Sequence, residues 1–284
     1  MSVHEQVFAA RQRLRDAGIP HIECDLEARL LAQHVLGWST ERFLTDAHAP
    51  APAGFAPSYD ALVSRRVTRE PFAYIVGGRE FWGLHFEVNP SVLIPRPSTE
   101  LIVEAVLGLF RERAAPLEIA DVCTGCGCVA IALAHERPAA TVIGTDISAE
   151  ALVVARRNAA RLGVSGRVTF RQGDLLNGID RPLDVILANP PYVVDRSAPA
   201  LQPEVRDHEP AVALFGGAEG LDLLTRLIDE APSRLRPGGY LVFEFGLGQD
   251  VEIEDMLERA SELHLVDIRR DLQGIARAAV ARRS

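Results

Sequence analysis

The fold follows from one stretch of the sequence, LEIADVCTGCGCVAIALAHE at residues 117–136. The apolar run over 117–122 predicts a buried strand, and the pattern over 129–135 predicts a helix. Gly125 and Gly127 stand in the loop between them, where glycine lets the backbone approach a ligand closely. A strand, a glycine loop and a helix in this order are typical of an open α/β sheet, which binds ligands at the carboxyl ends of its strands.

The same alternation continues to the end of the chain. We expect further strands at 141–145, 168–172, 183–188, 239–245, 263–270 and 276–280, and helices at 149–162, 221–235 and 251–260. Alternating strands and helices predict a mostly parallel sheet that helices cover on both faces. The last two strands are joined by a short connection, so we expect one of them to be antiparallel.

The N-terminal part has a different pattern. Residues 1–48 read as helices broken at 18–20 and 37, residues 49–57 as a loop rich in Ala and Pro, and residues 59–69 as another helix. Alternating apolar residues over 75–92 predict a hairpin, and Ser98-Thr99-Glu100-Leu101 offers a helix N-cap. We therefore expect a helical domain at 1–75, a hairpin linker at 76–95 and an α/β domain at 96–284.

Composition limits the function. The net charge is −9, which disfavours binding by neutralisation of many phosphates, so nucleic acid is an unlikely partner. The sequence has no lysine, which excludes Schiff-base chemistry on lysine and the phosphate-loop lysine. No apolar run is long enough to span a membrane, and no secretory signal stands at the N-terminus. We expect a cytoplasmic protein without membrane partners.

Acidic residues end three successive strands of the predicted sheet. Asp121 precedes the glycine loop, Asp146 ends the next strand, and Asp174 follows the third. An acid at position 146 can accept both hydroxyls of a ribose, and one at 174 is well placed for an adenine amino group. The order G-x-G-x-x-G of dinucleotide-binding loops is absent, although a dinucleotide or a simple tight turn stays possible from the loop alone.

Three cysteines, Cys123, Cys126 and Cys128, lie in or beside the glycine loop and could indicate a metal site. A tetrahedral zinc site needs four ligands, and the remaining cysteine, Cys24, is distant in the sequence. We expect no metal here, and read the cysteines as small side chains that fit a tight turn.

The fourth strand ends in Asn189-Pro190-Pro191-Tyr192. An amide or aryl amine nitrogen is a poor nucleophile, because its lone pair is delocalised, so its N–H groups must be held with the lone pair facing the electrophile. The Asn189 side-chain oxygen and the Pro190 carbonyl can each accept one N–H. Consecutive prolines make the loop rigid, and Tyr192 offers a face for a planar group. An activated methyl donor would then need mainly proximity and orientation.

These motifs resemble the HemK/PrmC family, which methylates the Gly-Gly-Gln glutamine of peptide-chain release factors. The resemblance covers nearly the whole chain and rests on further segments at 27–31, 71–77, 80–84, 93–97, 99–100, 201–206, 209–210, 220–222 and 271–277. It implies a helical domain that docks the release factor, a hairpin linker and a seven-stranded, Rossmann-like class I methyltransferase domain.

The resemblance also implies site residues. S-adenosyl-L-methionine, the methyl donor, would contact Cys123, Thr124, Gly125, Cys126, Gly127, Asp146, Ile147, Asp174, Leu175 and Asn189. The substrate glutamine would be held by residues 189–192. The chain departs from the family pattern at two positions: Cys123 stands where glycine is usual, and Ser98 stands where glutamate is usual.

Two alternatives remain open from the sequence. The same loop could serve an N6-adenine or N2-guanine methyltransferase that flips its base, with Arg11, Arg13, Arg15, Arg65, Arg66 and Arg69 as a basic face, although we favour a role for them in solvating the helices. A diverged homologue could instead methylate another amide, or could have lost donor binding through Cys123.

Overall fold

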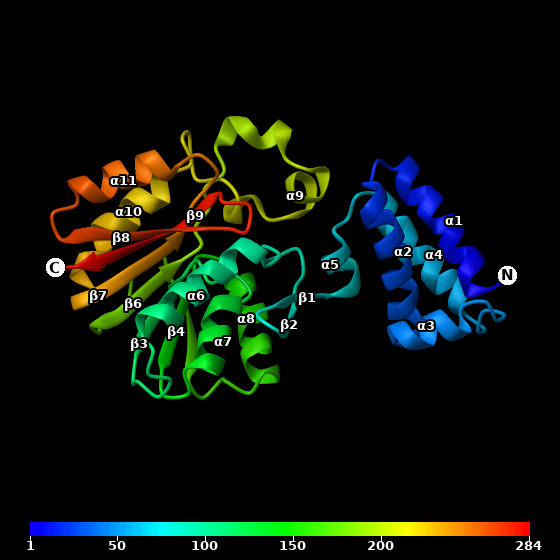
Figure 1. Cartoon of the computed structure of the whole chain (residues 1–284), viewed down its shortest axis with the longest axis horizontal. Coiled ribbons are helices and arrows are strands. Elements are labelled where there is room, and N and C mark those ends of the chain that lie inside the picture. Colours follow the sequence, from blue (N-terminus) through cyan, green and yellow to red (C-terminus); the bar gives the residue numbers. More distant parts are fainter. The chain divides into compact units, whose positions relative to one another are not determined.

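The computed structural model describes residues 1–284 as two compact units. The helical unit comprises Met1–Gly77 and Gln202–His208, and the α/β unit comprises Gly78–Leu201 and Glu209–Ser284 (Figure 1). None of the helices is long and apolar enough to cross a membrane.

The helical unit contains four helices in the regions where apolar periodicity predicts them: α1 (Val3–Asp16), α2 (His21–Leu36), α3 (Thr40–Asp46) and α4 (Phe55–Val67). Two short helices, α5 (Phe72–Val76) and α9 (Pro203–His208), were not predicted. Helix α1 begins with a capping box between Ser2 and Glu5, and α2 ends at Gly37 in a left-handed conformation. The loop predicted over 49–57 is too long, because α4 already begins at Phe55 and tolerates Pro57 in its first turn.

A buried ion cluster ties residues 202–208 into the helical unit. The Arg66 side chain is only 2% exposed and contacts Glu27 at 2.7 Å and Glu204 at 2.8 Å. Arg69 contacts the other oxygen of Glu204 at 2.6 Å. Burial opposes the ionisation of Glu204, but the hydrogen bonds from Arg69 and Arg66 outweigh it and hold its pKa below the usual value. The cluster thus joins α2, α4 and α9.

The α/β unit is built on a seven-stranded sheet with the order β5-β4-β3-β6-β7-β9-β8. Its strands are β3 (Glu118–Val122), β4 (Thr141–Asp146), β5 (Val168–Gln172), β6 (Leu183–Ala188), β7 (Leu235–Glu244), β8 (Leu263–Arg270) and β9 (Ala276–Arg283). The pairs from β5 to β7 are parallel, and β9 runs antiparallel to both of its neighbours. The predicted fold class and the antiparallel terminal strand are therefore confirmed.

Helices cover both faces of this sheet. They are α6 (Glu100–Leu109), α7 (Cys128–Glu136), α8 (Ala149–Arg161), α10 (Asp222–Glu230) and α11 (Asp250–Arg259). Helix α6 packs beside α7, and α10 packs beside α11 (Figure 1). Alternate residues of β3, β6 and β7 join α10 and α11 in one buried cluster, as the period of two of a strand requires.

Several predicted boundaries of the strands and helices are also wrong. The helix predicted over 221–235 ends at Glu230, because Pro232 lies in the 3₁₀ turn that follows and β7 already begins at Leu235. The hairpin, made of β1 (Gly78–Phe81) and β2 (Leu84–Glu87), begins three residues later than predicted, because 75–76 complete α5. The last strand, β9, extends to Arg283.

The sheet order fixes where a ligand can bind. Strand β3 pairs with β4 on one side and with β6 on the other. The connections from β3 and from β5 therefore cross the sheet in opposite directions, and ligands bind at such a switch point. The carboxyl ends of β3, β4, β5 and β6 meet at one edge. That edge carries Cys123, Asp146, Gly173 and Asn189.

Candidate functional site

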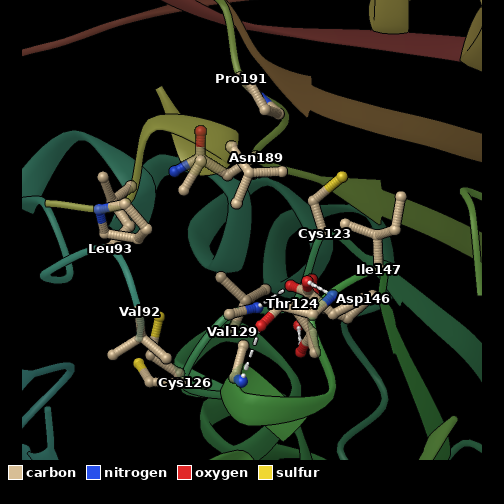
Figure 2. A pocket seen from close by; sticks show the side chains of 18 of the residues that line it. Val92, Leu93, Cys123, Thr124, Cys126, Val129, Asp146, Ile147, Asn189 and Pro191 are labelled. Carbon is tan, nitrogen blue, oxygen red and sulfur yellow. Dashed lines mark hydrogen bonds between the residues drawn. The ribbon is translucent and has the colours of Figure 1, made fainter. Parts of the chain in front are cut away.

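A pocket lies at the carboxyl edge of the parallel strands (Figure 2). It is lined by most of the residues that the sequence singles out: Cys123, Thr124, Gly125, Cys126, Asp146, Ile147, Asp174, Leu175, Asn189 and Pro191. Gly127, Pro190 and Tyr192 do not line it. Sequence analysis missed other lining residues, which come from the segment after the hairpin, from the loop before α10 and from the first turn of α10: Ser91, Val92, Leu93, Pro95, Thr99, Pro210, Val212, Ala213 and Leu223.

The glycine loop crosses the pocket in an unusual backbone conformation. Gly125 and Gly127 have φ values of +54° and +81°, which glycine adopts without strain. Cys123 has a φ of +58°, in the left-handed region that a residue with a Cβ rarely enters. The Cys123 side chain lines the pocket (Figure 2). The position that departs from the family pattern is therefore also a strained one.

Asp121 supports this loop from the end of β3. It is 2% exposed, and its Oδ2 accepts hydrogen bonds from the Thr124 hydroxyl at 2.6 Å and from the Ala130 N–H at 3.1 Å. Burial raises the pKa of Asp121 to about 7, although both hydrogen bonds oppose the shift. Asp121 thus connects the loop to α7.

Asp146 is oriented by backbone groups. Its Oδ2 accepts from the Gly125 N–H at 2.9 Å and its Oδ1 accepts from the Ser148 N–H at 2.9 Å. Burial raises its pKa, and these backbone hydrogen bonds act against the rise. A carboxylate oxygen can accept more than one hydrogen bond. Both oxygens can therefore still receive hydroxyls of a ligand, and the exposed Ile147 stands beside them at the rim.

Asp174 and Leu175 follow β5. Asp174 is exposed, and its Oδ2 accepts a hydrogen bond from Arg226 at 2.8 Å, which leaves Oδ1 for another donor. Leu175 is buried with a φ of +49°, and its carbonyl accepts from the Thr145 hydroxyl at 2.8 Å. That hydrogen bond holds a second strained residue against the pocket.

Asn189 belongs to a chain of hydrogen bonds that begins in the pocket. Its Nδ2 donates to Thr99 Oγ1 at 3.1 Å, and the Thr99 hydroxyl donates to Glu244 Oε2 at 2.7 Å. Glu244 Oε1 accepts from the Ser98 hydroxyl at 2.9 Å and from the Tyr192 hydroxyl at 3.1 Å. Glu244 is fully buried and forms no ion pair; burial raises its pKa, against these three hydrogen bonds.

Thr99 corrects a sequence expectation. It stands at the N-cap position of α6, but its side chain makes no capping hydrogen bond and turns to Glu244 instead. Sequence analysis also missed Glu244. The available signal was a lone acid at the carboxyl end of the apolar strand β7, beside the strand that carries Asn189.

The loop after Asn189 is held by contacts along its backbone. The Val193 N–H donates to the Leu214 carbonyl at 2.8 Å, and Gln249 Nε2 donates to the Tyr192 carbonyl at 3.2 Å. A Cβ added to Gly216 would stand 2.4 Å from the Pro191 carbonyl oxygen. The loop is thus fixed by its neighbours as well as by its two prolines.

The cysteines and arginines offer no second kind of site. All four cysteines are free thiols, and no three side chains of His, Cys, Asp or Glu come together in a group that could hold a metal ion. Each of the six arginines considered as a basic face pairs with a carboxylate: Arg11, Arg13, Arg15, Arg65, Arg66 and Arg69. Arg66 is buried, so the expectation that all six solvate the helices is wrong for it.

The arrangement favours a ligand with two chemically distinct parts. On one side, Asp146 and Asp174 present acceptors for hydroxyl and amino groups beside apolar residues such as Leu175. On the other side, Asn189 presents an amide. The residues therefore fit a nucleoside-bearing molecule whose far end reaches an amide-binding loop.

Comparisons with known proteins agree with this geometry. Residues 8–77 match the family model described as PrmC N-terminal domain, and residues 98–203 match that of the methyltransferase small domain. The chain is 42% identical over 280 residues to a release factor glutamine methyltransferase of Bradyrhizobium diazoefficiens, covering 95% of this chain and 91% of the relative. A relative of the same name from Cereibacter sphaeroides is 40% identical, with 99% of each chain covered.

Among solved structures, ribosomal protein L11 methylase from Lactobacillus delbrueckii subsp. bulgaricus is similar in fold. It superposes with a TM-score of 0.51 at 26% identity, covering 69% of this chain and 84% of that chain. The similarity extends over most of the chain in the sequence comparisons and over the greater part of it in the structural one.

Proposed function

Because the chain belongs to the family of release factor glutamine methyltransferases, the HemK/PrmC family, we propose that it methylates the Gly-Gly-Gln glutamine of a peptide-chain release factor. The reaction places one methyl group on the side-chain amide nitrogen. The methyl donor is S-adenosylmethionine, which when bound supplies a methyl carbon made electrophilic by a positively charged sulfur.

One side of the pocket binds the donor. Asp146 accepts the two ribose hydroxyls, which its fixed orientation between Gly125 and Ser148 supports. Asp174 accepts the adenine amino group through the oxygen that Arg226 leaves free. The remaining donor contacts are those of residues 123–127, Ile147, Leu175 and Asn189, which all border the pocket except Gly127.

The other side holds the glutamine amide. Asn189 Oδ1 accepts one N–H and the Pro190 carbonyl accepts the other, so the nitrogen lone pair faces the donor. Pro191 keeps the loop rigid, and Tyr192 gives the substrate a planar neighbour while its hydroxyl is held by Glu244. Catalysis then consists mainly of orientation and of dipoles directed at the charge that grows on nitrogen.

The observation that carries this proposal is the position of Asn189. It ends β6 in the same pocket as Asp146, and its Nδ2 is already engaged by Thr99, which leaves Oδ1 without a partner in the protein. An amide oxygen in that place suits an N–H group of a substrate.

We further propose the roles of the parts. Residues 1–75 dock the release factor, residues 76–95 form the linker between the two domains, and residues 96–284 catalyse the methyl transfer. The reaction takes place in the cytoplasm. Nucleic acid is not the substrate, because the arginines that could form a basic face are neutralised by carboxylates.

Methyl transfer from labelled donor to a purified release factor tests the proposal. We expect incorporation that is lost when the glutamine of Gly-Gly-Gln is changed to alanine. Incorporation that survives this change, or tight salt-dependent binding to RNA with methylation of its bases, would contradict it.

A further inference from the structure

We propose that Thr99 and Glu244 are positioning residues that set which way the Asn189 amide is turned. This inference rests on the proposed function, in which Asn189 Oδ1 must accept an N–H of the substrate. Neither residue needs to contact the substrate, because the hydrogen atoms available along the hydrogen-bonded chain Asn189–Thr99–Glu244 fix the orientation of the amide.

The hydrogens of three hydroxyl groups converge on Glu244. Ser98 and Tyr192 donate to Oε1, and Thr99 donates to Oε2. An ionised carboxylate is an acceptor only and can receive all three. Glu244 is fully buried and forms no ion pair, so these three hydroxyls, together with the more distant positive charge of Arg277, are what compensates its charge.

Because Thr99 donates to Glu244, it determines which end of the Asn189 amide faces it. A hydroxyl has one hydrogen, and that of Thr99 is committed to Glu244 at 2.7 Å. Thr99 Oγ1 can therefore only accept from Asn189, so it must face the NH₂ group at 3.1 Å. Thr99 is 2% exposed, so no solvent molecule competes freely for this place. The Asn189 oxygen is then on the branch that points away from Thr99.

The opposite arrangement would be unproductive. If Thr99 donated its hydrogen to Asn189, the amide would turn its oxygen to Thr99 and its NH₂ group to the substrate. Two NH₂ groups cannot hydrogen-bond to each other, because both are donors. The substrate amide would lose its acceptor. The charge on Glu244 thus selects the productive rotamer.

The test compares Thr99→Val with Thr99→Ser. Valine has the shape of threonine without the hydroxyl, and serine restores the hydroxyl. For Thr99→Val we expect kcat to fall by about 100-fold, with the dissociation constant of S-adenosylmethionine within about threefold of wild type. Thr99→Ser should return kcat to within about fivefold of wild type, since its hydroxyl can again bridge the two groups.

Ser98→Ala is the matched control. It also removes one hydroxyl from Glu244, but from the oxygen that does not lead to Asn189. Its kcat should fall less than about tenfold. Three outcomes overturn the proposal: Thr99→Val within threefold of wild type, equal losses in Thr99→Val and Thr99→Ser, or a loss of donor affinity in Thr99→Val that matches the loss of kcat.

A measurement without substrate separates this inference from the proposed function. In the nuclear magnetic resonance spectrum of the wild-type chain, the side-chain NH₂ protons of Asn189 should show a nuclear Overhauser contact with the Thr99 methyl group. The contact is expected even if the release factor is not methylated, in which case only the proposed function fails. Its absence from an assigned spectrum overturns the inference.

Discussion

Gly220 lies directly against the backbone of Tyr192: a Cβ built on Gly220 would stand 2.3 Å from the Tyr192 carbonyl oxygen. The same Cβ would stand 2.8 Å from Gln249 Nε2, which donates to that carbonyl. No side chain fits between these groups. The loop that ends in Tyr192 therefore depends on a glycine far along the chain.

Gly220→Ala should impair methyl transfer as well as stability. The clash must displace the Tyr192 carbonyl, and a misplacement of about 1 Å near reacting groups can cost about 100-fold in rate. Gly248→Ala is the matched control, because Gly248 has a φ of +79° against +75° for Gly220, but a Cβ there meets nothing within 4 Å. We expect Gly248→Ala to lose about 1 kcal/mol of unfolding free energy, Gly220→Ala to lose about 1–3 kcal/mol more because of its clash, and only Gly220→Ala to lose kcat. Equal kcat values would contradict this.

Cys123→Gly should stabilise the chain by up to about 1 kcal/mol, because it removes a Cβ from a left-handed residue. Gly125→Ala is the converse, since Gly125 has a φ of +54° and its added Cβ meets nothing within 4 Å. It should destabilise by a similar amount. Urea unfolding measures both. A loss of stability in Cys123→Gly would mean that packing of the Cys123 sulfur outweighs the strain. Calorimetry with S-adenosylmethionine should also show tighter binding, because the sulfur borders the pocket.

The sheet and the pocket edge could be predicted because local patterns determine them. Strands β3, β4 and β6 are short, mostly apolar runs followed by polar residues, and the βα alternation makes them parallel, so that their carboxyl ends lie at the same edge of the sheet. Asp146 and Asn189 were found because they end such strands. Boundaries were less accurate where a proline such as Pro232 ends one element just before the next begins.

Tertiary partners could not be predicted. Thr99 looks like an ordinary N-cap in the sequence, and only the fold brings Glu244, which lies 145 residues away, to its hydroxyl. Residues 202–208 likewise join the helical unit through Glu204, although the chain on both sides of them belongs to the α/β unit. Spacing in the sequence carries no information about such contacts.

Asp121→Asn should change how stability depends on pH. The folded pKa of Asp121 is raised from 3.8 to about 7, so its contribution to stability is complete at low pH and is lost as the pH rises through about 7. Asparagine cannot ionise, and its one oxygen can accept from both Thr124 and Ala130, which share Oδ2 in the wild type. At pH 8 the variant should therefore be more stable, by on the order of 2–4 kcal/mol, and near pH 4 the gain should vanish.

Urea unfolding at pH 4 and pH 8 measures this difference. Asp229→Asn is a suitable control, because Asp229 is exposed on α10 and forms no hydrogen bond or ion pair. It should leave the pH dependence of the wild type unchanged. If the unfolding free energy of Asp121→Asn depended on pH as that of the wild type does, ionisation of Asp121 would cost the folded chain no stability.

Glu204→Ala should destabilise the helical unit by about 2 kcal/mol or more, because it leaves the buried Arg66 with Glu27 as its one carboxylate partner. Asp46→Ala removes the partner of Arg42 in an exposed pair, with side chains 59% and 47% exposed, and should cost less than about 0.5 kcal/mol. Thermal unfolding of the two variants compares them. Equal losses would mean that burial adds nothing to the Glu204 cluster.

Asn189→Ala should abolish turnover and leave donor binding largely intact, since Asp146 and the glycine loop are unchanged. We expect kcat to fall about 1000-fold or more, whereas the donor dissociation constant should rise less than about tenfold, through the loss of the one donor contact that Asn189 makes. Asn189→Asp keeps an oxygen in the same place but cannot donate to Thr99, whose hydrogen is already given to Glu244. It also sets a second negative charge beside a buried one. We therefore expect Asn189→Asp to be as inactive as Asn189→Ala. An active Asn189→Asp variant would show that an acceptor oxygen alone is sufficient and that Thr99 does not control the amide.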